Sequence, residues 1–294
     1  MIKRGKSINM FLINGDVNGC VKCTLKNWTG IAYRIPRIKL SDMKERLDLK
    51  QSGIYFLFGI SDDFDKNIAY IGQANIRQNN KGILNRLEEH KRNPEKDYWN
   101  EAIVFTTSNN SLGSTELNYL ENKLCDLAIK ANRYIIKNGN LPHLGNTSEE
   151  IESDMDEFID YIKSVMVVLG HKLLMPLTTE ESASPIASKE LILYLKIKRQ
   201  GILTEAVCKQ TSDGYVLLKG SQINQIESKD IPEKIKLERK ISKIDLETKK
   251  LLEDKLFNSP TYAAVFVLGR RANGRKVWKT LYGKSLEEIE SDAD

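Results

Sequence analysis

The sequence predicts an α/β (α+β) fold in which helices pack on a small antiparallel sheet. Residues 53–60 and 68–72 form apolar strand patterns on either side of a polar turn, which is typical of a hairpin. A helical pattern at 82–92, a strand pattern at 101–107 and a long helical pattern at 114–131 follow. The order strand, strand, helix, strand, helix indicates a compact sheet covered by helices.

Length and composition set the class of protein. The chain has 294 residues, of which 40% are hydrophobic and 29% charged, the balance of a globular protein with about two domains. The apolar runs are much shorter than the ~20 residues that a membrane helix needs, so we expect no membrane association. The 4 cysteines do not form a disulfide framework, which favours the reducing cytoplasm.

Charge is distributed unevenly along the chain and suggests four segments. Residues 1–50 carry 11 basic and 4 acidic residues, and residues 51–147 carry 11 of each. Residues 148–185 carry 2 basic and 9 acidic residues, and residues 186–294 carry 21 and 16. We expect a β-rich N-terminal segment, a central α/β module, an acidic helical connector with a linker, and a second small α+β domain.

The first and third segments are expected to be structural. Apolar residues alternate with polar ones at 8–12 and 21–25, which predicts two strands, interpreted as a flap on the central module. Acids crowd the early turns of a helical pattern at 148–169, where they complement the helix dipole. A solvated helix is the favoured interpretation of this acidic face, and repulsion of nucleic acid is the functional alternative.

Two tyrosines mark the predicted hairpin of the central module. They belong to the tripeptides Gly-Ile-Tyr at 53–55 and Tyr-Ile-Gly at 70–72. In an antiparallel pair, Tyr55 and Tyr70 can project toward one face of the sheet and hold a water and a phosphate oxygen. The alternative is a pair of half-buried aromatic side chains that stabilise the hairpin.

Arg86 and His90 are the next candidates. They lie four residues apart in the first predicted helix and therefore share one helical face. A guanidinium group beside an imidazole suits a phosphate, because arginine offers a fixed fork of donors to the charge that develops on phosphorus. The alternative is a surface arginine with a histidine at the end of a helix.

Glu121 is the sharpest single candidate. It lies within an apolar stripe of the second helix, four residues after Leu117 and three before Leu124. A carboxylate there is costly unless it is paired or binds a metal. Its alternative is a residue at the edge of the stripe whose head reaches solvent, and Glu116 is a weaker candidate of the same type.

With these five residues in this order, the chain resembles the GIY-YIG nuclease family over about residues 51–145. The resemblance implies a divalent-metal-dependent DNA endonuclease in which one Mg²⁺ (or Mn²⁺) ion binds Glu121. It also implies that a water associated with a tyrosine attacks phosphorus. We assign Tyr70 to orient or deprotonate this water, with Tyr55 in support, and the reverse assignment stays open at this point. Such an enzyme would act in restriction, defence or repair.

The loop at 77–82 is longer than in the compact family pattern, which bears on substrate geometry. The alternative is a catalytically silent protein that uses the same fold to bind DNA or to read its modification.

The C-terminal segment contains a basic turn. Residues 265–284 include six basic residues and no acid. The expected DNA-binding residues are Arg270, Arg271, Asn273, Arg275, Lys276, Trp278 and Lys279, with the cations on phosphate and the tryptophan on a base or sugar. The alternative is a basic surface turn beside a core tryptophan.

Residues from about 186 onward resemble the domain of unknown function that often follows such nuclease modules. Within them, 213–221 and 259–278 resemble the RAMA domain associated with DNA modification, which implies recognition of a modified base. The pattern here predicts a short strand at 215–219, a helix within 229–255 and an apolar helix at 262–268.

Overall fold

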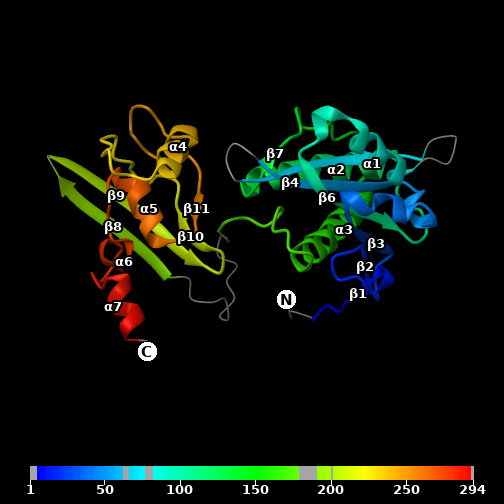
Figure 1. The fold of residues 1–294 in the computed structure, drawn as a ribbon, viewed down its shortest axis with the longest axis horizontal. Helices are drawn as coiled ribbons and strands as arrows, with labels where there is room; N and C mark the ends of the chain where they lie inside the picture. Colours follow the sequence, from blue (N-terminus) through cyan, green and yellow to red (C-terminus); the bar gives the residue numbers. More distant parts are fainter. Residues whose placement is uncertain (1–4, 62–65, 77–81, 179–190, 200, 293–294) are drawn as a thin grey trace. The chain divides into compact units, whose positions relative to one another are not determined.

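The computed structural model describes residues 5–61, 66–76, 82–178, 191–199 and 201–292 (Figure 1). The chain divides into two compact units, Met1–Pro176 and Leu177–Asp294, and each is described by itself. Within the described ranges, no helix has both the length and the apolar character needed to cross a membrane. The turn expected between the hairpin strands, the long loop before the first helix and the expected linker lie at least partly outside the described residues, at 62–65, 77–81 and 179–190.

The first unit is built on one seven-stranded sheet with the order β1-β2-β3-β6-β4-β5-β7. Its strands pair antiparallel except for β7, which runs parallel to β5. The strands are β1 Ile8–Leu12, β2 Val21–Leu25, β3 Gly30–Pro36, β4 Gly53–Ile60, β5 Asn67–Ala74, β6 Trp99–Thr107 and β7 Ile135–Ile136. The two predicted N-terminal strands are confirmed, and they extend the sheet of the central module.

The strand β3, which the sequence patterns did not predict, joins these two parts of the sheet. It pairs with β6 along its whole length, from Gly30 opposite Thr107 to Pro36 opposite Glu101. Both faces of β3 are buried, so its sequence lacks the alternation of polar and apolar residues that identifies a half-exposed strand.

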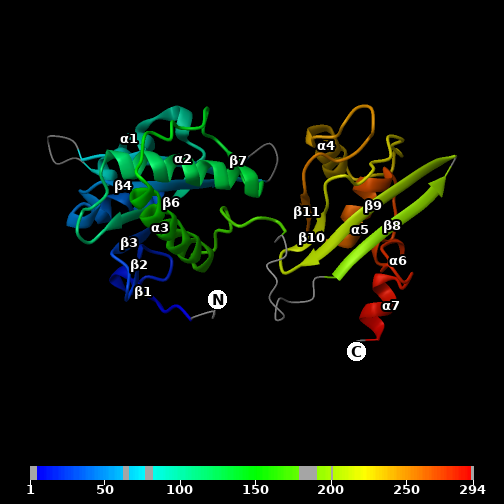
Figure 2. The same cartoon turned by 180° about the vertical axis from the view of Figure 1, so that it is seen from behind.

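Helices cover both faces of this sheet (Figures 1 and 2). Apolar residues of α1 (Ile83–Arg92) pack on one face in the same cluster as residues of the short helix at Arg37–Met43. The other face carries α2 (Ser114–Ala131) and α3 (Glu149–Val168). Short 3-10 helices also form at Ile13–Gly15, Leu47–Leu49 and Pro94–Lys96. The predicted order of strands and helices in the central module is therefore confirmed.

The acidic helix α3 belongs to this unit. Phe158, Ile162 and Val165 are buried in the same core cluster as α2, while most of the acids stay at the surface. Residues 1–50 and 148–176 thus pack with the central module in one compact body, where the sequence suggested separate segments, because their apolar faces complete its core.

The second unit contains a four-stranded antiparallel sheet with the order β11-β10-β9-β8. Its strands are β8 Leu191–Arg199, β9 Ile202–Thr211, β10 Gly214–Leu217 and β11 Lys255–Phe257. The apolar helix α5 (Pro260–Leu268) packs on this sheet, as its residues Ala263–Leu268 share a buried cluster with Leu193, Leu195 and Cys208. The remaining helices are α4 Glu233–Ile241, α6 Gly274–Val277 and α7 Leu286–Ser291.

Two expectations for this unit need correction. The long hairpin of β8 and β9 was missed, and only β10 corresponds to the predicted strand. The helix expected within 229–255 is limited to α4, because a turn follows in which Asp245 accepts hydrogen bonds from the N–H groups of Glu247 and Thr248. A side chain that bonds nearby backbone in this way competes with helix formation.

Candidate active site

The two tyrosines lie side by side on one face of the first sheet, as the alternation predicts. Tyr55 on β4 pairs with Gly72, and Tyr70 on β5 pairs with Leu57. The centroids of the two phenol rings are 6.2 Å apart. Tyr55 is buried, whereas Tyr70 is partly exposed. Of the two hydroxyl groups, that of Tyr70 is therefore the better placed to meet a substrate.

Gly72 lies directly beneath Tyr55. A Cβ atom at Gly72 would come within 2.4 Å of the Tyr55 hydroxyl oxygen, a distance that non-bonded atoms do not adopt. The backbone of Gly72 is ordinary extended strand and does not itself require a glycine. A glycine is needed here because the Tyr55 side chain approaches the backbone so closely.

For the DNA cleavage that the family resemblance implies, we expect Gly72→Ala to reduce the rate by about 100-fold, because the methyl group displaces the Tyr55 phenol and small misplacements of a reacting group have effects of this size. The measurement is the initial rate of cleavage, with thermal melting to show that the variant folds. Gly139→Ala is the matched control, since nothing lies within 4 Å of the added Cβ there. A Gly72→Ala variant that cleaves as fast as Gly139→Ala would contradict this role.

Asn138, which the sequence patterns did not identify, bonds the backbone of β5 between Tyr70 and Gly72. Its Oδ1 accepts a hydrogen bond from the N–H of Ile71 at 3.0 Å, and its Nδ2 donates one to the carbonyl oxygen of Ile71 at 2.8 Å. This side chain imitates a neighbouring strand and so fixes the backbone between Tyr70 and Gly72.

His90 on α1 is joined to Tyr55. A hydrogen bond of 2.6 Å links the Tyr55 hydroxyl and His90 Nε2, and both side chains are buried. Burial lowers the pKa of His90 to about 4, and the positive charges of Lys96 and Arg86 act in the same direction. Burial likewise raises the pKa of Tyr55. Both groups are therefore neutral at pH 7, and His90 positions Tyr55 without carrying charge.

Arg86 lies one turn before His90 and remains accessible. Its Nη1 pairs with Glu89 Oε2 at 2.8 Å, and its side chain is 38% exposed. The charge of Arg86 also counteracts the effect of burial on the pKa of Tyr70 and of Glu121. The guanidinium is thus within electrostatic reach of both the second phenol and the carboxylate, as the family resemblance implies.

Glu121 is half-buried on α2 and is held by a glutamine from β5. Burial raises the pKa of Glu121, and a hydrogen bond of 3.0 Å from Gln73 Nε2 to Glu121 Oε2 opposes that shift. Gln73 also donates to Asn118 Oδ1 at 2.6 Å. Because side chains alternate along β5, Gln73 points to the face of the sheet opposite to Tyr70 and Gly72, toward α2. Gln73 directly follows the tripeptide Tyr-Ile-Gly at 70–72, and this position is the signal by which the sequence could have identified it as a site residue.

Glu116 has a separate structural role. Its Oε2 accepts a hydrogen bond of 3.0 Å from the N–H of Gly113, the residue that precedes α2. This contact satisfies a backbone donor at the start of the helix. The preference for Glu121 over Glu116 as the site carboxylate is consistent with these contacts.

The surroundings of Glu121 fit a hydrated divalent cation. Among the described residues there is no group of three or more His, Cys, Asp or Glu that could hold a metal, so a site closed by protein ligands is absent there. Gln73 Oε1, on the amide that bonds Glu121, is buried and lacks a hydrogen-bond partner. One carboxylate and one unsatisfied amide oxygen suit Mg²⁺, which retains several water ligands.

Lys96, like Asn138 and Gln73, is a residue of the site that the sequence patterns did not identify. Its Nζ lies 3.5 Å from the centroid of the Tyr70 ring. Burial, together with the smaller effect of the charge of Arg86, lowers the pKa of Lys96 to about 8. No helical spacing relates Lys96 to the other candidates, because it follows α1 in the short helix Pro94–Lys96. It adds a second cation beside the exposed phenol.

Trp278, expected to stack on a base, is in the core of the second unit. The side chain is fully buried, and its Nε1 donates a hydrogen bond to the carbonyl oxygen of Pro260 at 2.9 Å. The stacking role is therefore wrong, because no base can reach a side chain that α5 and the sheet enclose. The alternative of a core tryptophan beside a basic turn is the one that the structure shows.

Two of the cations in the basic turn form ion pairs with acidic residues. Arg275 pairs with Glu290 at 2.5 Å and Lys276 with Glu287 at 3.8 Å, so the acidic C-terminal residues lie against the turn. Asn273 caps α6 through a hydrogen bond of 3.1 Å from the N–H of Arg275 to its Oδ1. These contacts reduce the charge that the turn presents to DNA.

The other expected residues of the turn remain near the surface. Arg271 and Lys279 are exposed and Arg270 is partly exposed, and Arg271 Nε donates to the carbonyl oxygen of Asp230 at 3.0 Å. Of the set, Arg270 lies at a cavity, which is described below.

Comparison with known proteins gives a match for the second unit. No curated protein and no solved structure matches the chain. Residues 195–290 match the family model of a domain of unknown function, DUF4357, which confirms the expectation of such a domain in the C-terminal part. The match begins within β8 and ends within α7, so it covers most of the second compact unit.

Proposed function

We propose that the first unit is a divalent-metal-dependent DNA endonuclease of the GIY-YIG type. The observation that carries the proposal is electrostatic: two phenols share one face of the sheet, and the charges of Arg86 on α1 and of half-buried Glu121 on α2 both act on Tyr70. Each of these groups has a role in phosphodiester hydrolysis, and all four have shifted pKa values, a clustering that is typical of functional sites.

The substrate phosphate is bound by the cations in this proposal. Arg86 offers two parallel donors to the non-bridging oxygens, where negative charge builds up in the transition state. Lys96 supplies a second positive charge next to Tyr70. A bound Mg²⁺ ion, held at Glu121 with Gln73 beside it, would supply Lewis-acid stabilisation of the leaving oxygen.

The two tyrosines have different roles. Tyr70 is the phenol that meets solvent, and we assign it to orient the water that attacks phosphorus. Burial raises the pKa of Tyr70 and the charge of Glu121 raises it further, while Arg86 opposes both, so the phenol remains protonated at neutral pH without additional positive charge. Tyr55, fixed by His90 and by the absence of a side chain at Gly72, is a positioning residue.

The reaction exchanges one oxygen substituent of phosphorus for another. An oxygen–phosphorus bond forms from water, the bond to the leaving strand oxygen breaks, and the water proton is transferred to solvent or to that oxygen. The products are a phosphomonoester end and a hydroxyl end.

A cleavage assay on the purified full chain tests the proposal. With Mg²⁺, supercoiled plasmid or one of a panel of duplex, branched, damaged and methylated oligonucleotides is expected to be nicked or cut, and EDTA is expected to abolish cleavage. DNA binding without cleavage of any substrate would contradict the enzyme and support the alternative, a DNA-binding or modification-reading protein.

A further inference from the structure

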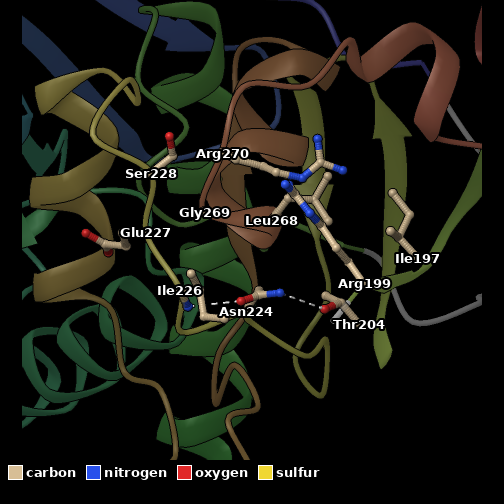
Figure 3. Close-up of a pocket in the computed structure, with 10 residues that line it drawn as sticks. All are labelled: Ile197, Arg199, Thr204, Asn224, Ile226, Glu227, Ser228, Leu268, Gly269 and Arg270. Carbon is tan, nitrogen blue, oxygen red and sulfur yellow. Dashed lines mark hydrogen bonds between the residues drawn. The ribbon is translucent and has the colours of Figure 1, made fainter. Parts of the chain in front are cut away.

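The second unit contains a cavity of about 190 Å³ that no part of the proposed chemistry uses (Figure 3). It lies between the tip of the β8–β9 hairpin, the segment 224–228 and the C-terminal end of α5. Its volume is below the roughly 300–1,000 Å³ of pockets for drug-sized ligands, so it suits a unit smaller than a complete cofactor.

Two arginines from distant parts of the sequence meet at this cavity. Arg199 ends β8 and Arg270 follows the end of α5, and both residues line the cavity (Figure 3). In the part of the chain that the structure describes, neither forms an ion pair with a carboxylate, and Arg270 Nη1 donates only to the carbonyl oxygen of Arg271 at 3.3 Å. Two neighbouring cations without a counter-charge favour binding of an anion between them.

Among the described residues that line the cavity, the one acid is already paired. Glu227 Oε1 accepts from Arg239 Nε at 2.7 Å, and its side chain points away from the two arginines in Figure 3. Arg239 also donates to the carbonyl oxygens of Asn224 and Phe266, which ties the wall of the cavity to α5. The cavity therefore presents net positive charge.

The rest of the cavity is prearranged. Ile197, Ile226 and Leu268 contribute apolar walls. At the floor, Asn224 Nδ2 donates to Thr204 Oγ1 at 3.3 Å, and Asn224 Oδ1 accepts from the N–H of Ile226 at 2.9 Å. These contacts fix the wall before a ligand arrives, which limits the entropy lost on binding.

Gly269 sets the position of Arg270 at the rim. It ends α5 with φ of +66°, and a Cβ there would lie 2.3 Å from the carbonyl oxygen of Ile226. A glycine is thus required both by the left-handed backbone and by the close approach of the 224–228 segment.

We propose that this cavity binds one nucleotide of a DNA strand, with a phosphate between Arg199 and Arg270 and the sugar or base against the apolar walls. This assignment of the cavity depends on the proposed function in one respect, the choice of DNA as the ligand. It differs from the basic turn as a whole, because Arg275 and Lys276 in that turn have acidic partners while the two cavity arginines have none among the described residues.

Binding of a fluorescently labelled oligonucleotide to the full chain, measured by anisotropy in EDTA, tests this site without any cleavage. Arg199→Ala and Arg270→Ala are each expected to weaken binding by about ten-fold or more, the effect of losing a hydrogen-bonded charge. Each should also reduce the slope of log Kd against log salt concentration by about one.

Lys198→Ala is the matched control. It removes the same charge from the neighbouring residue, but side chains alternate along β8, so Lys198 lies on the face opposite to Arg199. Lys198→Ala is expected to change binding by less than about two-fold, as for an exposed charge away from the ligand. Thermal melting of all three variants shows whether they fold.

The site is overturned if both arginine variants bind DNA as tightly as the wild type, or if Lys198→Ala weakens binding as much as they do. Competition separates the source of the anion: a mononucleotide is expected to displace the oligonucleotide at lower concentration than inorganic phosphate, and equal potency of phosphate would contradict a nucleotide site. Weaker binding by the arginine variants with no cleavage by the wild type would support the cavity and contradict the nuclease. Cleavage by the wild type with unchanged binding by the variants would do the reverse.

Discussion

Glu121→Gln is expected to reduce metal-dependent cleavage by about 1,000-fold or more, because it removes the one carboxylate assigned to the metal and with it several kcal/mol of transition-state stabilisation. The same substitution should leave the stability of the fold unchanged or slightly higher. Burial raises the pKa of Glu121, so the free energy of folding opposes the ionised form at this position. Loss of activity with retained stability distinguishes a functional carboxylate from a structural one.

Glu116→Gln provides the matched control for this prediction. It lies on the same helix, and its contact with the N–H of Gly113 is expected to contribute about 1 kcal/mol to stability at most. Cleavage rates in Mg²⁺ and melting temperatures of both variants give the comparison. Equal rates for wild type and Glu121→Gln would exclude this metal site, as would equal loss of activity in folded Glu116→Gln protein.

Arg86→Lys is expected to reduce cleavage by about 100-fold or more while DNA binding in EDTA changes little. Lysine keeps the charge but lacks the planar fork that bonds two phosphate oxygens at once, and removing one preorganised donor at a reacting centre has effects of this size. Because the side chain is 38% exposed and its ion pair is with nearby Glu89, its replacement by another cation should cost little stability.

Arg92→Ala is the control for Arg86, since Arg92 lies on the same helix, is 77% exposed and pairs with Glu88 at 3.3 Å. Single-turnover rates at saturating DNA separate chemistry from binding. If Arg86→Lys cleaves at the rate of Arg92→Ala, the guanidinium does not act on the phosphate and the assignment fails.

Local patterns predicted the geometry of the candidate site well. Alternation along β4 and β5 places Tyr55 and Tyr70 on one face, and the spacing of four residues places Arg86 near His90. The position of Glu121 within an apolar stripe predicted its half-burial. Each of these relations depends on residues a few positions apart or on one hairpin, and backbone periodicity determines them directly.

The same patterns failed where a side chain's surroundings come from remote segments. Trp278 and Tyr70 are both aromatic residues near basic ones, yet Trp278 is enclosed by the core of the second unit while Tyr70 is partly exposed. Lys96 reaches Tyr70 through the turn that follows α1, a path that no sequence period describes. The strand β3 was missed because both of its faces are buried.

By itself, the sequence determined the strand, strand, helix, strand, helix order of the central module, the faces on which its candidate residues lie, and the uneven distribution of charge. Only the tertiary structure decided which charges remain uncompensated: the acids near the C-terminus pair with Arg275 and Lys276, whereas Arg199 and Arg270 meet at a cavity without an acidic partner among the described residues. The physical reason is the separation along the sequence over which each effect acts. Backbone periodicity acts over a few residues, while electrostatic pairing and burial depend on which distant segments the packed core brings together.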